Sequence, residues 1–215
     1  MIERQSNQGG ADWLRERAGH ATASCFADIL AVGRNGQPLK AREDYLMHLV
    51  VERITGEPIV TPSSFAMQWG TEAEPYARAT YEEETGAIVR EVGFKKHPKH
   101  EWVGASSDGL VGPKGGIEIK SPYNSAIHLL TWETGMPEHH KPQVQGQIWV
   151  LELDWVDFCS FDPRMQAGAE HLKLYRQRIY RDDAYISKTL EPGVLAFLAE
   201  VQAKVDLLNS MEVAA

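Results

Sequence analysis

The chain has 215 residues, 43% of them hydrophobic, a composition typical of a globular domain and not of a disordered segment. Its two cysteines, Cys25 and Cys159, cannot form a disulfide framework and match no zinc-binding spacing, so a reducing compartment is expected. The formal net charge of -8 excludes a surface that is basic throughout, the usual mark of a nucleic-acid-binding domain.

The acidic excess is confined to two segments. Residues 57–91 carry seven acidic and two basic side chains, and residues 182–215 carry six and two. The rest of the chain is close to neutral, so a locally positive path for DNA remains compatible with this sequence.

The N-terminal part shows no apolar core of a signal peptide, and no later run reaches membrane-spanning length, so a cytoplasmic protein without a membrane partner is expected. Residues 13–19 predict a short helix that ends in glycine, and residues 25–32 predict a second helix. Thr22 or Ser24 can cap that second helix. A helix start with hydroxyls and a nearby arginine is also a natural phosphate site, and the pattern alone leaves both interpretations open.

Residues 41–55 form an amphipathic helical pattern that we interpret as scaffold, and a further helix is expected from about Met67 to Gly86. Thr71 and Glu74 have the spacing of a capping box, which gives Glu74 a structural explanation. Glu74 is equally a carboxylate that could face a metal ion.

Residues 88–96 and 101–105 predict strands, with His97 and His100 as exposed turn residues between them. They lead into residues 106–122, which predict a turn, a glycine-rich hairpin and a short strand. Ile117 and Ile119 alternate with Glu118 and Lys120 there, and side chains two apart on a strand share a face.

The hairpin can fold Asp108 back beside Glu118, because glycines 112, 115 and 116 permit backbone angles that other residues avoid. Two carboxylates with open positions suit Mg²⁺, which prefers oxygen ligands and keeps several waters. Lys120 could then orient or activate a metal-bound water. The alternative is an ordinary Asp-Gly turn followed by a strand with a solvated face.

The second half of the chain predicts a helix at 124–132, a longer helix at 137–151 that contains Gln143 and Gln145, a buried strand at 156–161, an alternating strand at 171–180 and a C-terminal helix from 182. Helices on both sides of a mixed β-sheet follow from this order, so the fold class is α/β or α+β. We expect one domain over residues 1–215, with a core at about 13–165 and a C-terminal strand and helix at 170–215.

Several of these segments together resemble the phage lambda exonuclease family, the YqaJ-type viral recombinases of the PD-(D/E)XK nuclease superfamily. The matching segments are Trp-Leu-Arg-Glu-Arg-Ala-Gly-His-Ala-Thr-Ala-Ser, Trp-Gly-Thr-Glu-Ala-Glu-Pro-Tyr-Ala-Arg, Ser-Ser-Asp-Gly-Leu with Ile-Glu-Ile-Lys-Ser-Pro, Gln-Val-Gln, and Phe-Asp-Pro-Arg-Met. They run in the family's order from residue 13 to residue 165 and imply a restriction-endonuclease-like core. Ser107 departs from the pattern, because the superfamily name places proline before the catalytic aspartate.

The resemblance implies a role for each matching residue. Asp108 and Glu118 would bind Mg²⁺, with Mn²⁺ as an alternative, Lys120 would act on the attacking water, and Glu74 would complete the site. Gln145 would lie beside the water or the scissile phosphate, whereas Gln143 is left outside the site.

A second implied site is a pocket for a terminal 5′-phosphate. Arg17 would form it with Ser24 and Ser106, since the guanidinium fork can donate two hydrogen bonds to phosphate. Arg34 would be a further DNA contact. Met67 would match an apolar wedge at the duplex end, and a core methionine is the alternative.

The implied function is Mg²⁺-dependent 5′ to 3′ digestion of double-stranded DNA to mononucleotides. It would leave 3′ single strands for phage-type recombination by strand annealing. The family implies a homotrimeric ring, a single-strand annealing protein as partner, and a phage or prophage protein in a bacterial host cell. The alternatives are a sequence-specific endonuclease of the same fold and a non-catalytic DNA-binding recombination module.

Overall fold

The structure is a computed structural model that describes residues 10–34 and 36–211. The ends of the expected 1–215 domain lie outside the described residues. The helices are α1 Ala11–Arg17, α2 Phe26–Leu30, α3 Lys40–Thr55, α4 Phe65–Thr85, α5 Ser125–Thr134, α6 Lys141–Val150, α7 Asp183–Tyr185 and α8 Glu191–Asn209. The strands are β1 Ala21–Thr22, β2 Val89–Arg90, β3 Lys95–Lys96, β4 Val103–Ala105, β5 Gly109–Val111, β6 Gly115–Lys120, β7 Trp155–Phe161 and β8 Leu174–Tyr180.

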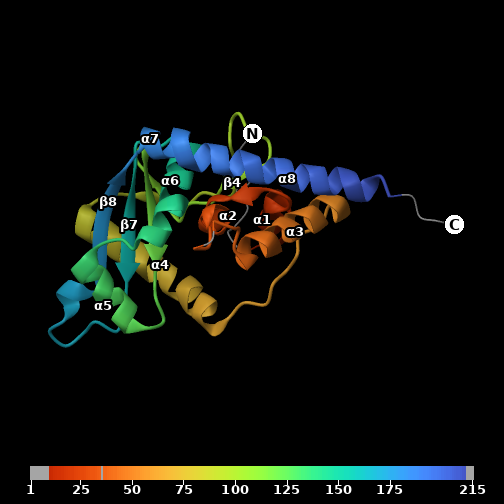
Figure 1. Cartoon of the computed structure of the whole chain (residues 1–215). Helices are drawn as coiled ribbons and strands as arrows, with labels where there is room; N and C mark the ends of the chain where they lie inside the picture. Colours follow the sequence, from red (N-terminus) through yellow and green to blue (C-terminus); the bar gives the residue numbers. More distant parts are fainter. Residues whose placement is uncertain (1–9, 35, 212–215) are drawn as a thin grey trace.

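Five strands form the larger sheet, in the order β2-β5-β6-β7-β8. β5 and β6 make the predicted antiparallel hairpin, with Gly109 opposite Ile117. β6 then pairs with β7 in parallel, and the crossover between them carries α5 and α6. The larger sheet is therefore mixed and flanked by helices, as the sequence predicts (Figure 1).

The two faces of this sheet enter different cores. Ile117, Ile119 and Phe161 pack with Ala77 and Tyr81 of α4 on one face. The opposite face contributes Val156 and Phe158 to a larger core that holds α2, α6 and α8. Alternation along β6 thus buries its isoleucines against α4 and directs Glu118 and Lys120 toward α6.

The N-terminal helices form a second layer beside the sheet. β1 pairs with β4 in a three-stranded sheet with the order β1-β4-β3. α8 runs along α3 (Figure 1), where Phe197 stacks on Tyr45 at 5.6 Å between ring centroids and Arg42 pairs with Glu200 at 2.7 Å. α2 packs against α3, α6 and α8, and Trp13 of α1 donates a hydrogen bond to Ser106, just before β5.

Many element boundaries agree with the sequence, and several differ. The strand expected over 88–96 is divided into β2 and β3, which belong to different sheets. The segment expected as one helix over 137–151 begins with a 3-10 turn at Glu138–His140, before α6. α4 begins near residue 65, because the Ser64 hydroxyl accepts a hydrogen bond from the Met67 backbone N–H and caps it. No helix in the described part of the chain is long and apolar enough to cross a membrane.

Candidate active site

The turn before β5 and the end of β6 bring Asp108, Glu118 and Lys120 together, as predicted. Lys120 Nζ lies 2.7 Å from Glu118 Oε1, and Asp108 Oδ2 accepts a hydrogen bond from the Ile119 backbone N–H at 2.7 Å. The Ser107 hydroxyl donates to the carbonyls of Gly109 and Ile117 at 2.9 and 3.1 Å. Serine at the position where the superfamily has proline thus ties the turn to the hairpin by hydrogen bonds.

The pKa values in this cluster reflect crowded negative charge. Burial, together with the nearby Glu118 and Glu74 carboxylates, raises the pKa of Asp108 well above its usual range, although Lys120 opposes the shift. Burial lowers the pKa of Lys120, but the charges of Glu118 and Asp108 outweigh it and the net shift is upward. Lys120 is therefore an ammonium at neutral pH, and the cluster favours a further positive charge.

Two glutamines of α6 hold the Glu118 carboxylate. Gln143 Nε2 donates to Glu118 Oε1 at 2.6 Å, and its Oε1 accepts from Lys120 Nζ at 3.0 Å. Gln147 Nε2 donates to Glu118 Oε2 at 2.5 Å and to the Ser106 carbonyl at 3.1 Å. The two are four residues apart and share a helix face.

The structure corrects the role expected for Gln145. Its side chain is 2% exposed, its Nε2 donates to the Tyr180 carbonyl at 2.8 Å, and its Oε1 accepts from the Asp182 N–H at 3.0 Å. Gln145 joins α6 to the end of β8 and does not reach the carboxylates, because it lies two residues, about 200° of helical rotation, from Gln143. Gln143, which the sequence analysis left outside, takes that place, and Gln147 was missed although its spacing to Gln143 could have revealed it.

Glu74 belongs to the carboxylate cluster and not to a helix cap, so the capping-box interpretation is wrong. Thr71 lies inside α4, where its hydroxyl donates to the Met67 carbonyl at 3.1 Å. Glu74 pairs with Arg78 at 2.6 Å. Burial and the Glu118 charge raise the pKa of Glu74, against the opposing effect of Arg78.

The donor set fits a hard divalent cation with few protein ligands. Among residues 10–34 and 36–211, no three carboxylate, imidazole or thiol side chains converge closely enough to hold a metal ion by themselves. Mg²⁺ is commonly held by one or two carboxylates, with waters and substrate phosphates in the remaining positions. Asp108 and Glu118 supply that number, and the raised pKa of Asp108 shows negative charge that a cation would offset.

The residues expected to hold a terminal phosphate also lie together. The Arg17 guanidinium stacks over Trp13 at 4.1 Å and donates to the Thr22 hydroxyl at 3.3 Å, and that hydroxyl lies 3.2 Å from Ser24 Oγ. Trp13 Nε1 donates to Ser106 Oγ at 3.0 Å. Neither hydroxyl caps the following turn or helix, so the capping prediction for Thr22 and Ser24 is wrong. The Thr22 hydroxyl contacts both Arg17 and Ser24.

Hydrogen bonds link the residues expected to hold a terminal phosphate to the carboxylates. Ser106 takes part in the pocket through its hydroxyl and accepts from Gln147 through its carbonyl. Gln147 in turn holds Glu118. Ser106 and Gln147 therefore connect the surroundings of Arg17 to the Glu118 carboxylate.

The two remaining predicted DNA contacts are exposed. Arg34 lies in the loop that the bridge between Val32 and Pro38 closes. Met67 is 59% exposed on the first turn of α4, so the alternative of a core methionine is excluded. Both positions are compatible with contact to DNA, and neither belongs to the carboxylate cluster.

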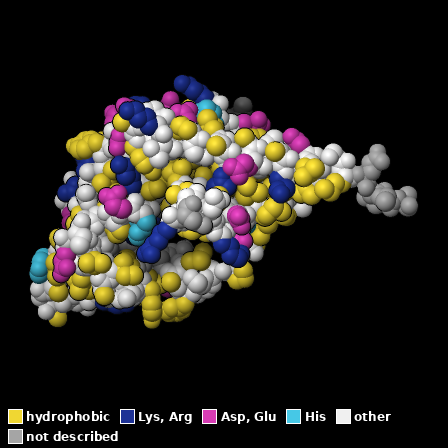
Figure 2. All heavy atoms as spheres, in the orientation of Figure 1, with side chains coloured by type: hydrophobic (Ala, Val, Ile, Leu, Met, Phe, Trp, Pro, Cys, Tyr) yellow, Lys and Arg dark blue, Asp and Glu magenta, His cyan; other side chains and the backbone are white. Residues whose placement is uncertain are grey.

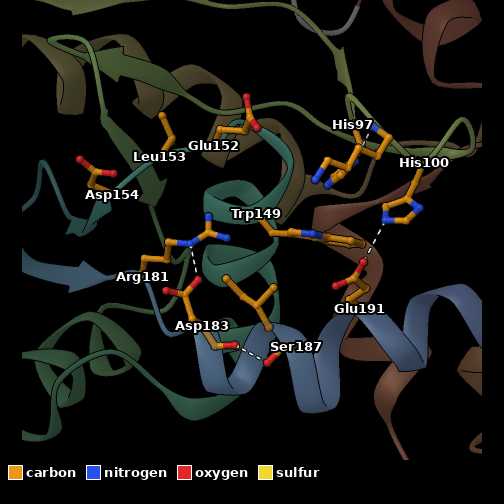
Figure 3. A pocket seen from close by; sticks show the side chains of 12 residues that line it. His97, His100, Trp149, Glu152, Leu153, Asp154, Arg181, Asp183, Ser187 and Glu191 are labelled. Carbon is orange, nitrogen blue, oxygen red and sulfur yellow. Dashed lines mark hydrogen bonds and ion pairs between the residues drawn. The ribbon is translucent and has the colours of Figure 1, made fainter.

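A separate pocket of about 510 Å³ lies at the opposite end of α6 (Figure 3). His97 and His100, expected as exposed turn residues, stack there against Trp149 at 4.6 and 5.6 Å, and His97 is only 8% exposed. Burial is the main cause that lowers the pKa of His97, to about 4. Two ion pairs lie in its lining, His100 with Glu191 at 3.0 Å and Arg181 with Asp183 at 2.6 Å.

Comparison with known proteins identifies what this arrangement is similar to. The model of the YqaJ-like viral recombinase domain matches residues 12–154. An alkaline exonuclease from Laribacter hongkongensis, LHK-Exo, has a crystal structure that superposes with a TM-score of 0.84 at 40% identity, covering 93% of this chain and 96% of that one. A second structure of that relative contains dAMP.

Two more distant similarities support the same fold. A phage-related exonuclease from Haemophilus somnus superposes with a TM-score of 0.63 at 14% identity, over 89% of this chain and 95% of that chain. An uncharacterized protein of Acanthamoeba polyphaga mimivirus is 26% identical over 175 residues, and the match spans 30% of that protein's length.

Proposed function

The chain belongs to the YqaJ-like viral recombinase family, and on that premise we propose that it is a divalent-metal-dependent exonuclease acting on double-stranded DNA. The observation that carries the proposal is the convergence of Asp108, Glu118 and Lys120 at one end of the hairpin. The chain that contains this cluster is 40% identical to an alkaline exonuclease over 93% of its own length.

Each residue of the cluster has a distinct part in this proposal. Asp108 and Glu118 would hold Mg²⁺ or Mn²⁺, which supplies charge stabilisation at the attacked phosphate and lowers the pKa of water. Lys120, kept as an ammonium by its carboxylate neighbours, orients the water and stabilises phosphate charge. Gln143 fixes Lys120 and Glu118 relative to each other, and Glu74 adds negative charge at the rim.

The phosphate pocket supports 5′ to 3′ polarity. Arg17, Ser24 and Ser106 can bind a terminal 5′-phosphate while the next phosphodiester bond lies at the carboxylates, since Gln147 connects the two places. If the two places are one nucleotide apart, each step would release a mononucleotide. The dAMP in the structure of the Laribacter relative is a nucleoside monophosphate of that class.

The biological context is proposed from the family. Digestion from 5′ ends leaves 3′ single strands, which a single-strand annealing protein could take up during recombination of a phage or prophage in a bacterial cell. A homotrimeric ring around the DNA would let a chain with a net charge of -8 stay on its substrate by enclosure more than by attraction.

Four DNA substrates of one sequence test the proposal. These are a linear duplex with 5′-phosphates, the same duplex with 5′-hydroxyls, a closed circle and a 3′-end-labelled linear duplex, each incubated with the protein and Mg²⁺. We expect digestion of linear DNA only, faster from 5′-phosphates, with mononucleotide products and late release of the 3′ label. Cleavage of the closed circle would favour the endonuclease, and binding without digestion of any substrate would favour the non-catalytic module.

A further inference from the structure

Three aromatic side chains form a platform next to the catalytic strand. We call Phe65, Trp69 and Tyr123 the aromatic ledge. The Tyr123 ring meets Phe65 edge to face at 5.0 Å and Trp69 at 5.8 Å between centroids. Phe65 is 65% exposed and Tyr123 is 50% exposed. Figure 2 shows hydrophobic side chains gathered along the lower edge of the molecule, over α5 and the beginning of α4.

Arg164 holds this ledge in place from behind. Its guanidinium donates to the carbonyls of Pro122 and Tyr123 at 3.2 and 2.9 Å, and lies over the Trp69 ring at 4.6 Å. Asp162, whose side chain is fully buried, fixes the guanidinium through its Nε at 2.7 Å. The hydrogen bonds of Arg164 therefore fix the backbone at Tyr123, so the exposed rings have a defined position, as expected of a binding surface.

The ledge is close to the proposed site of cleavage along two elements. Tyr123 follows Lys120 by three residues. Trp69 precedes Glu74 by five residues on α4, a rise of about 7.5 Å along the helix axis, or about two nucleotide steps of 3.4 Å. Met67, also exposed, lies next to the ledge on the first turns of the same helix.

We propose that Phe65 and Tyr123 bind an unpaired nucleobase of the DNA end, beside the proposed site of cleavage. Exposed aromatic faces stack on any base, because every base has a π-face, so the contact suits an enzyme that digests all sequences. The Arg164 guanidinium lies over the Tyr123 ring at 5.8 Å and places a positive charge at the ledge. This inference rests on the proposed function, and it names a base-binding surface in addition to the phosphate pocket and the carboxylates.

The test compares two DNA ends that differ only in bases. Both are 5′-phosphorylated duplexes with two unpaired nucleotides on each strand at one end. In the second duplex those nucleotides are abasic. Affinity is measured by fluorescence anisotropy with the full chain in EDTA, so that the readout does not depend on turnover.

We expect the wild type to prefer the end with bases, and Tyr123→Ala to lose about 5- to 150-fold of that preference, the equivalent of 1–3 kcal/mol per stacked base at 1.4 kcal/mol per tenfold. Tyr123→Phe keeps the ring and should keep the preference. Phe65→Ala should lose part of it. Ile127→Ala is the matched control, since Ile127 is also 50% exposed but lies on α5, outside the ledge.

Equal wild-type affinity for the two ends, or an unchanged preference in a folded Tyr123→Ala protein, would overturn the inference. A Tyr123→Ala protein that changes its oligomeric state while keeping the preference would assign the ledge to contact between copies of the chain, and would also overturn it. Digestion with Mg²⁺ is measured in parallel. Normal digestion without a preference for ends with bases would contradict only the base-binding role of the aromatic ledge. Absence of digestion at every end would contradict the proposed exonuclease function.

Discussion

Gln143 and Gln145 offer a sharp test, because they are two residues apart on one helix and the structure gives them different partners. We expect Gln143→Met to lower kcat by about 10- to 150-fold. Its hydrogen bonds to Lys120 and Glu118 involve charged groups, each worth about 1.5–3 kcal/mol, and one such bond used in the transition state corresponds to that range. The unfolding free energy should change little, because Gln147 and Lys120 still hold Glu118.

Gln145→Met should have the opposite effect. It leaves the Tyr180 carbonyl and the Asp182 N–H without their partner, at about 1–3 kcal/mol each, so the melting temperature should fall by at least about 4 °C in a chain of this length. Its kcat, measured well below that temperature, should stay within about twofold of the wild type.

The assays are initial rates on saturating 5′-phosphorylated linear duplex with Mg²⁺, and thermal unfolding followed by circular dichroism. A stable but inactive Gln145→Met protein, together with a fully active Gln143→Met protein, would refute the assignment of the two glutamines. A variant that loses both stability and kcat is then assayed at lower temperature, where a purely structural loss should recover.

Four further outcomes are expected. Lys120→Ala should lower turnover by about 10²- to 10⁴-fold yet keep Mg²⁺ binding by calorimetry, and lost metal affinity with surviving turnover would contradict its role. Glu74→Gln keeps a hydrogen-bonding group for its arginine partner but removes the charge, so a folded protein with at least about tenfold slower digestion is expected, and normal activity would count against a catalytic part. Arg17→Ala should reduce the ratio of rates on 5′-phosphorylated and 5′-hydroxyl ends by about 10- to 150-fold, with the hydroxyl rate almost unchanged. Burial raises the pKa of Asp162, but hydrogen bonds from Arg164 outweigh it and the pKa is lowered, so its stabilisation is present above an unfolded pKa of about 3.9 and lost as pH falls through the folded value. The difference in unfolding free energy between the wild type and Asp162→Asn, measured with urea, should therefore be constant above about pH 4 and shrink as the pH falls below it.

The catalytic hairpin could be predicted from the sequence because its signals are local. Alternation of Ile117 and Ile119 with Glu118 and Lys120 fixes which side chains share a face, and the glycine-rich connection fixes the fold-back of Asp108. The burial of the isoleucines against α4 and the direction of Glu118 toward α6 follow from the same period of two.

Several of the misplaced predictions depended on where a helix begins or how it is rotated. Thr71 and Glu74 have capping-box spacing, but the cap is Ser64, about two turns before Thr71, so that spacing falls inside α4. In α6, all residues from 144 to 150 are buried, so no polar face marks the side that meets the sheet. α6 contains three glutamines, and its packing against β6 decides which of them bond to Glu118. Because Glu118 lies on the α6 side of β6, it binds the pair four residues apart, Gln143 and Gln147, and leaves Gln145 to the backbone of Tyr180 and Asp182. The rotation of that helix, and with it the choice of catalytic glutamine, is therefore a property of the packed fold.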